Sequence, residues 1–283
     1  MINHIVKTTE DQRLLLDLNI DYQDIENDGY DYSKVVVKKP WGYEYLIFSN
    51  PEVAIWVLYL KSNFQTSMHC HTNKTTSLVV LEGEVICSSL GGHFPRIAGQ
   101  GLFIEKGAFH QTAAISEMGA FVLEIETPVN KRDLVRLTDS YGRVGMGYET
   151  ADQHAFDLQN YNYISYQTRH MQHNLRKRFG GCSLTFNIIS TASELAKIQD
   201  LDGEDIVALL DGELLDDSGQ SALSIGQAIT VNQMIRLDPL YVRQTSQILT
   251  VKQIDHELKV SDYVANFLRD NNVDPVFVVP GDA

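Results

Sequence analysis

Short runs of β-branched and aromatic residues, broken at intervals by glycine or asparagine, dominate the first half of this 283-residue chain. Intervals of roughly 8–12 residues from strand to strand are typical of antiparallel sandwiches and barrels, whereas βαβ units need longer repeats. The pattern therefore predicts an all-β fold. The clearest expected strands are Val35–Val37, Tyr43–Phe48, Val53–Leu60, Ser77–Leu81, Glu84–Ser88, Gly101–Ile104 and Ala120–Ile125.

A second β-rich block follows a polar connector near residues 148–159 and repeats a phrase of the first block. Val79–Val85 and Ala208–Leu214 each consist of a hydrophobic strand, an acidic-Gly turn and a return strand. A Gly-Gln pair follows both, at Gly99 and at Gly226. We interpret this as a degenerate internal duplication, with a chance likeness of two hairpins as the alternative. The expected strands are Ser183–Ile189, Asp205–Leu210, Ala228–Val231 and Ile248–Gln253.

These patterns divide the chain into four parts, and its length agrees with about two domains. Residues 1–35 are expected to form a helix and loop extension, with the helix near Glu10–Leu18. Residues 36–150 form the first barrel and residues 151–257 a degenerate second one. Residues 258–283 form a tail in which Lys259–Asn272 has the apolar spacing of a helix and a strand follows.

Composition narrows the classes of partner. The net charge of −14 argues against a nucleic-acid partner, because phosphate contacts need a basic surface, although a local basic pocket for a phosphorylated small molecule remains compatible. No apolar run reaches the ~20 residues that span a bilayer, and the N-terminus does not resemble a secretory signal. The three cysteines give no disulfide framework. We expect a cytoplasmic protein that binds neither nucleic acid nor membrane.

Three histidines stand out. Residues two apart in a strand project to the same face, so His69 and His71 are expected to point together while Cys70 points away. An HxH pair alone is a weak signal and is more often polar surface. His110 lies three residues after Gly107, in a second glycine-rich stretch.

This arrangement resembles the two conserved motifs of the cupin superfamily. The matching residues are His69, His71, Gly83, Gly99, Gly107 and His110. The resemblance implies two cupin-like antiparallel β-barrels, a bicupin, with a divalent metal inside the first. The chain departs from the motifs at Asn63, Glu105, Ala114 and Thr76, and Thr76 stands where the motif has its carboxylate ligand. Three neutral imidazoles suit Zn, Fe, Co or Ni; the alternative is a metal-free pocket with vestigial histidines.

Two flanking segments are similar to the cupin domain of type II mannose-6-phosphate isomerases. They are Lys39–Glu44, with its Pro-Trp-Gly, and the segment from Glu126 to Arg143, and the resemblance covers about residues 36–145. It implies a sugar phosphate or nucleotide sugar as the ligand, and a metal that polarises the sugar while a proton moves between neighbouring carbons. Such a reaction needs a Lewis acid, a general base and a cation for the phosphate.

The resemblance suggests roles for further residues, each with a simpler alternative. Arg143 is the first candidate for the phosphate, with Arg136 and Lys106 as weaker ones, although Arg143 could only close a salt bridge to Asp139. Glu105 is the candidate base, with Lys106 beside it as a second catalytic candidate, unless both are solvated. Trp41 is expected to stack on a sugar or to anchor packing. Gln65 and Gln111 are expected to line the pocket or to face water.

The C-terminal segments Val260–Leu268 and Val276–Ala283 are similar to the opening helix and strand of thiamine-diphosphate-dependent enzymes. The alternative is an amphipathic helix that docks on the barrel. The main hypothesis is a metal-dependent sugar-phosphate isomerase or epimerase that forms a homodimer, as cupins often do. The second is a non-catalytic sugar-binding or regulatory module that precedes a thiamine-diphosphate enzyme, and a third is an Fe(II) dioxygenase.

Overall fold

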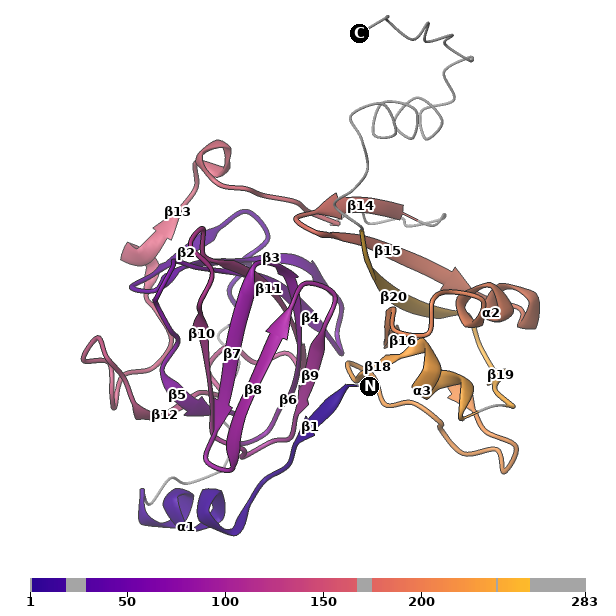
Figure 1. Cartoon of the computed structure of the whole chain (residues 1–283), viewed down its shortest axis with the longest axis horizontal. Helices are drawn as coiled ribbons and strands as arrows, with labels where there is room; N and C mark the ends of the chain where they lie inside the picture. The colour runs from indigo at the N-terminus through magenta and orange to yellow at the C-terminus, as the bar shows by residue number, and fades with distance from the viewer. Residues whose placement is uncertain (1, 19–28, 167–174, 238, 255–283) are drawn as a thin grey trace, which may run out of the picture. The chain divides into compact units, whose positions relative to one another are not determined.

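The computed structural model describes residues 2–18, 29–166, 175–237 and 239–254, and Met1–Gln253 form one unit in it. Two β-sheets make up the first block and face each other, with β7 and β8 in front of β6, β9 and β11 in Figure 1. The larger sheet contains, in spatial order, β1 (Asn3–Ile5), β9 (Gly101–Ile104), β6 (Thr75–Glu82), β11 (Ala120–Thr127), β4 (Ala54–Leu60), β3 (Gly42–Ser49), β2 (Val36–Lys39) and β13 (His154–Ala155). The smaller contains β12 (Val135–Thr138), β5 (Met68–Cys70), β10 (His110–Ala114), β7 (Glu84–Ser89) and β8 (Gly92–Ile97).

A hydrophobic core fills the space between these two sheets. Strand alternation sends Leu58 and Leu60 of β4, Leu78 of β6 and Val122 of β11 inward, where they meet residues such as Cys87 of β7. All pairings in both sheets are antiparallel except that of β1 with β9. The inner face is therefore apolar along most of its length, and polar residues on it need a specific explanation.

The second block contributes one five-stranded antiparallel sheet, β14-β15-β20-β16-β18, which packs on the outer face of the larger sheet. Its strands are β14 (Leu175–Phe179), β15 (Cys182–Ile189), β20 (Ser246–Gln253), β16 (Ile206–Asp211) and β18 (Ala228–Thr230). Packing on both sides explains why β3, β4 and β6 are buried almost throughout, where a one-sided sheet would alternate. A buried hydroxyl joins the two blocks, since Ser77 Oγ donates to Gly226 O at 2.9 Å and accepts from Ala228 N at 3.0 Å.

The strand order of this sheet repeats that of the first block. Reading β18-β16-β20-β15-β14 against β9-β6-β11-β4-β3 aligns every neighbour. The turn glycines match as well, because Gly83 and Gly212 have φ of 78° and 89°, and Gly99 and Gly226 have 82° and 77°. A side chain in this left-handed region is strained, so glycine is required at these turns. The repeated order supports the duplication over a chance likeness of two hairpins.

Helices replace most of the second facing sheet in the repeat. Among the described residues, the pair β17 (Leu214–Leu215) and β19 (Tyr241–Val242) is the part of that sheet that forms, and α2 (Ala192–Gln199) and α3 (Val231–Ile235) cover the face with Leu195, Ile198 and Met234. The described N-terminus carries α1 (Thr9–Asp17), capped by Thr8 and Asp11. Two short 3₁₀ turns, Ala151–Gln153 and Leu158–Asn160, lie in the connector.

The predicted fold class is confirmed, with antiparallel sheets in two related blocks, the second one degenerate, and a short helix near the N-terminus. The expected helix and strand of the tail lie outside the described residues. Within the part of the chain that the structure describes, no helix is long and apolar enough to cross a membrane.

Candidate metal centre

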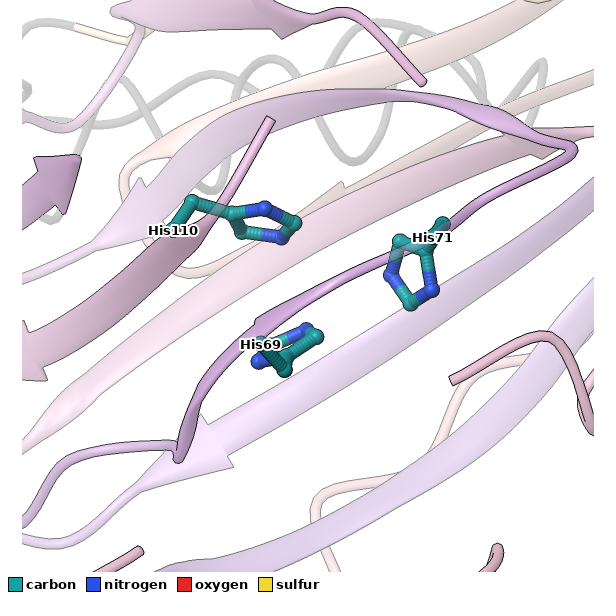
Figure 2. A group of neighbouring side chains, drawn as sticks. All are labelled: His69, His71 and His110. Atoms are coloured by element: carbon teal, nitrogen blue, oxygen red, sulfur yellow. The ribbon is translucent and has the colours of Figure 1, made fainter. Parts of the chain in front are cut away.

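Three histidines meet inside the first block, as Figure 2 shows. His69 lies on β5 and His71 directly follows that strand, while His110 begins β10. Because β5 and β10 pair antiparallel with His69 opposite His110, residues 41 positions apart become cross-strand neighbours. Their ligand nitrogen atoms all lie within 4.8 Å of one another. The predicted metal-binding set is thus assembled by strand alternation and by one cross-strand pairing.

Backbone carbonyls fix the orientation of each ring. His69 Nδ1 lies 2.8 Å from Ser67 O, His71 Nδ1 lies 2.5 Å from Asp133 O, and His110 Nδ1 lies 3.1 Å from Ala108 O. A carbonyl oxygen only accepts, so in each pair Nδ1 carries the proton and donates it. The neutral rings then present their Nε2 lone pairs. Such outer hydrogen bonds are the usual means by which proteins set the tautomer of a metal-binding histidine.

Burial also keeps these rings uncharged. It lowers the pKa of His110 to about 4, and it lowers the pKa values of His69 and His71 well below the ordinary value, with neighbouring histidines and cations acting in the same direction. Arg136 contributes at His69, and Lys74 contributes at all three rings. The rings therefore do not need to lose a proton before they bind a metal at neutral pH.

The structure supplies no carboxylate to this group among the described residues. Thr76, in the position of the motif's Glu, lies on β6 with its hydroxyl buried and without a hydrogen-bond partner in the described part of the chain. Its cross-strand partner on β11 is Glu126, whose Oε1 accepts from Trp56 Nε1 at 3.0 Å and whose Oε2 pairs with Lys74 Nζ. The carboxylate nearest to Thr76 in register is thus already committed to other partners.

A pocket opens beside the histidines. It is lined by all three of them, by apolar residues and by several charged groups. The lining comprises Lys39, Trp41, Glu44, Leu58, Leu60, Thr66, Ser67, His69, His71, Lys74, Leu78, His110, Thr112, Val122, Glu124, Lys131, Leu134, Arg136, Arg143 and Tyr148. An apolar wall with a few convergent polar groups is typical of a small-molecule site.

The two arginines expected to bind phosphate both lie at this pocket, and both already have acidic partners. Arg143 Nε and Nη2 contact the Asp139 carboxylate at 3.2 and 2.7 Å, and Nη1 contacts Glu149 at 2.7 Å. Arg136 Nη1 donates to Met146 O and Gly147 O at 2.6 and 2.7 Å, and its Nη2 lies 3.4 Å from the Glu149 carboxylate. The guanidinium groups therefore hold the segment 139–149 against the pocket. For Arg143 this agrees with the alternative interpretation, in which its side chain forms a salt bridge to Asp139.

Other predicted residues divide between the pocket and the surface. Trp41 lines the pocket and is buried. Gln111 points to the opposite face of β10 from His110 and donates to Thr66 O at 2.9 Å, and Gln65 donates to Ser140 Oγ at 3.2 Å. Glu105 accepts from Lys7 N at 3.0 Å, and Lys106 is exposed. The lining of this pocket does not include these last four residues.

Buried charges on the inner faces of strands are the functional candidates that the sequence pattern missed. Glu44 on β3 is held by Lys131 at 3.3 Å and by Lys39 at 3.4 Å. Burial would raise the pKa of Glu44, but the two ammonium groups outweigh burial and set it at about 2. Val122, Glu124 and Glu126 lie two residues apart on β11 and therefore share one face of that strand. Acidic residues on the same alternating face as apolar ones were the available signal.

No protein-family profile and no curated protein matches the chain. It is similar to the structure of KdgF from Halomonas sp., with 14% identity over 40% of this chain and 91% of that one, at a TM-score of 0.30. An RmlC-like cupin from Shewanella frigidimarina gives 15% identity over 39% of this chain and 88% of that one, at 0.29. The capsular polysaccharide assembling protein CapF from Staphylococcus aureus gives 14% identity over 37% of this chain and 34% of that one, at a TM-score of 0.33. The chain thus spans about a third of CapF, and at these TM-scores the likenesses carry no argument about function.

Proposed function

We propose that this chain is a metal-dependent isomerase or epimerase of cupin type that acts on a sugar phosphate or a nucleotide sugar. The observation that carries the proposal is the convergence of three histidines whose Nδ1 atoms are all engaged by backbone carbonyls. Three rings held in the metal-binding tautomer at the wall of a pocket, two of them buried and one half-buried, suit a divalent metal better than they suit packing alone.

The donor set fits a transition metal. His69, His71 and His110 would hold it through Nε2, and three neutral nitrogen ligands favour Zn, Fe, Co or Ni over Mg or Ca. When bound, such a metal supplies a Lewis acid that polarises a carbonyl or hydroxyl oxygen of the ligand. The absence of a carboxylate from the described ligand set leaves coordination positions for that oxygen.

The chain's own residues orient the ligand around this point. Trp41 and Leu58 provide an apolar wall against which a sugar ring can lie. Arg136 and Arg143 place positive charge at the pocket while they hold the segment 139–149. A phosphate would share these guanidinium groups with Glu149 and Asp139.

A non-catalytic binding module is the second candidate, and one feature of the pocket favours it. Each of its five cationic side chains already has a carboxylate partner, so the pocket offers no unpaired positive charge for a phosphate among the described residues. A neutral sugar would bind there more readily than a sugar phosphate. The thiamine-diphosphate part of this hypothesis depends on the tail, which lies outside the described residues.

Turnover by the zinc-loaded protein tests the proposal. We expect interconversion of mannose 6-phosphate and fructose 6-phosphate, or epimerisation of a nucleotide hexose, to depend on added metal and to vanish in His71→Ala. His93→Ala removes an exposed histidine of β8 and is the matched control, with activity expected to be unchanged. Sugar binding without turnover in the metal-loaded protein would favour the binding module. Equal turnover by wild type and His71→Ala would exclude a catalytic role for the three histidines.

A further inference from the structure

Four glutamates with largely buried side chains lie in or beside the pocket, and three of them pair closely with cations. Glu44 accepts a hydrogen bond from the Tyr148 hydroxyl and pairs with two lysines. Glu126 accepts a hydrogen bond from Trp56 and pairs with Lys74. Glu149 is held by Lys39 and by both arginines. Each of these three carboxylates is thus paired with at least one buried ammonium or guanidinium group.

Glu124 differs from these three. The nearest cation to its carboxylate is Lys131 Nζ at 4.0 Å, beyond hydrogen-bond range, and no described residue donates a hydrogen bond to it. Its side chain is 12% exposed and lines the same pocket as the histidines. A nearly buried carboxylate without donors is costly unless it carries a proton or meets a ligand. This residue therefore needs an explanation that packing does not give.

The position of Glu124 on β11 directs it toward the site. Strand alternation places it on the inner face with Val122, and its cross-strand partners are Trp56 on β4 and Leu78 on β6. Val122 and Leu78 line the pocket with His71 and His110. The carboxylate thus shares one pocket wall with apolar residues and lines the same pocket as the histidines.

The surroundings also set its charge state. Burial has the largest influence on the pKa of Glu124 and raises it. The cations Lys131 and Lys74 lower this pKa, whereas the carboxylates Glu126 and Glu44 raise it. The net result is a raised pKa. A carboxyl whose pKa lies above its ordinary value, closer to neutral pH, exchanges protons more effectively as a general base and acid.

We propose that Glu124 is the catalytic residue that removes and returns the substrate proton, and that the substrate is an α-hydroxy carbonyl compound such as an open-chain sugar. This inference rests on the proposed function. In the step, the C–H bond next to the substrate carbonyl breaks and its proton moves to a Glu124 oxygen. The electron pair of that bond forms a carbon–carbon double bond, and the carbonyl oxygen takes up the negative charge. The proton of the neighbouring hydroxyl group moves to this oxygen, and a carbonyl forms at the carbon that lost its hydrogen as the double-bond electrons take the proton back from Glu124 at the former carbonyl carbon. The isomerisation is then complete without any oxidant or co-reactant.

The test uses Glu124→Gln, which keeps the size of the side chain and removes its acid–base capacity. Zinc-loaded protein is incubated in deuterium oxide with mannose 6-phosphate or fructose 6-phosphate, and proton NMR follows the loss of the C–H signal. We expect wild type to exchange the hydrogen and Glu124→Gln to lose about 10²–10⁴-fold in rate. Zinc content and KM should change less than threefold. Glu84→Gln, at an exposed position of β7, is the control and should keep the wild-type rate.

Two activity results would overturn the assignment. One is an exchange rate in Glu124→Gln within threefold of wild type. The other is loss of exchange in Glu105→Gln with full exchange in Glu124→Gln, which would return the role to the glutamate expected from sequence.

A second readout does not depend on turnover. In protein labelled with carbon-13 at the glutamate carboxyls, the Glu124 resonance is the one missing from Glu124→Gln, and its titration midpoint should lie above the ordinary value of about 4.3. A midpoint at or below that value would overturn the inference. If wild type exchanges no hydrogen with either sugar phosphate, the proposed function fails for them. A raised midpoint in that case shows only that Glu124 binds its proton more tightly than an ordinary glutamate, and it does not rescue the catalytic role.

Discussion

Replacing Lys74 by methionine probes the buried charge network behind the site. The Lys74 side chain is 1% exposed and pairs with Glu126, which is fully buried. Methionine keeps most of the aliphatic stem but leaves Glu126 with only Trp56 Nε1 at 3.0 Å and Lys131 Nζ at 3.9 Å. Removing one partner of a buried ion pair typically costs about 3–5 kcal/mol, because the other charge stays buried. We expect Lys74→Met to lower the free energy of unfolding by an amount in that range.

Urea unfolding of the single and double variants measures this loss. Lys38→Met removes an exposed lysine from β2 and should change the free energy of unfolding by less than about 0.5 kcal/mol. The double variant Lys74→Met/Glu126→Gln removes both charges and should recover most of the stability. A single variant within about 1 kcal/mol of wild type, or a double variant no more stable than the single, would refute the reasoning.

Two further predictions concern the same molecule. The pKa of Glu44 is held at about 2, below the ordinary glutamate value, so its contribution to stability is present above about pH 4 and is lost as the pH falls toward 2. Glu44→Gln should therefore flatten the pH dependence of the unfolding free energy by roughly 3 kcal/mol over that window, and an unchanged slope would contradict this. Ser77→Ala should cost about 1–3 kcal/mol, because Gly226 O and Ala228 N lose their buried partner, whereas exposed Ser224→Ala should cost almost nothing. Equal stability of the two serine variants in urea would count against this bridge between the blocks.

The fold was predictable because short apolar runs and glycine turns specify strands locally. The repeated phrase at Gly83 and Gly212 identified the duplication, since both turns require a left-handed backbone. The replacement of most of the second facing sheet by α2 and α3 was less visible. Those helices are short and carry their apolar residues at few positions, so their periodicity is a weak signal next to the strands around them.

At the site, alternation and the motif correctly brought His69, His71 and His110 together. The glutamates and lysines of the pocket were not found, because these residue types are normally expected to face water. Glu124 and Lys74 are buried only because cross-strand partners far away in the chain surround them. Arg143 was expected at the pocket with Asp139 as its alternative partner, and both expectations hold, whereas its second carboxylate partner, Glu149, was not expected.

Metal content of the purified chain tests the central claim most directly. The protein is stripped with a chelator, loaded with zinc or cobalt, desalted and measured by elemental analysis, with the cobalt absorption spectrum as a report on coordination. The three-histidine centre predicts about one metal ion per chain, a cobalt spectrum of nitrogen and oxygen ligands, and loss of both in His71→Ala and His110→Ala but not in His93→Ala. Metal-free wild type after loading, or full occupancy in His71→Ala, would contradict the account.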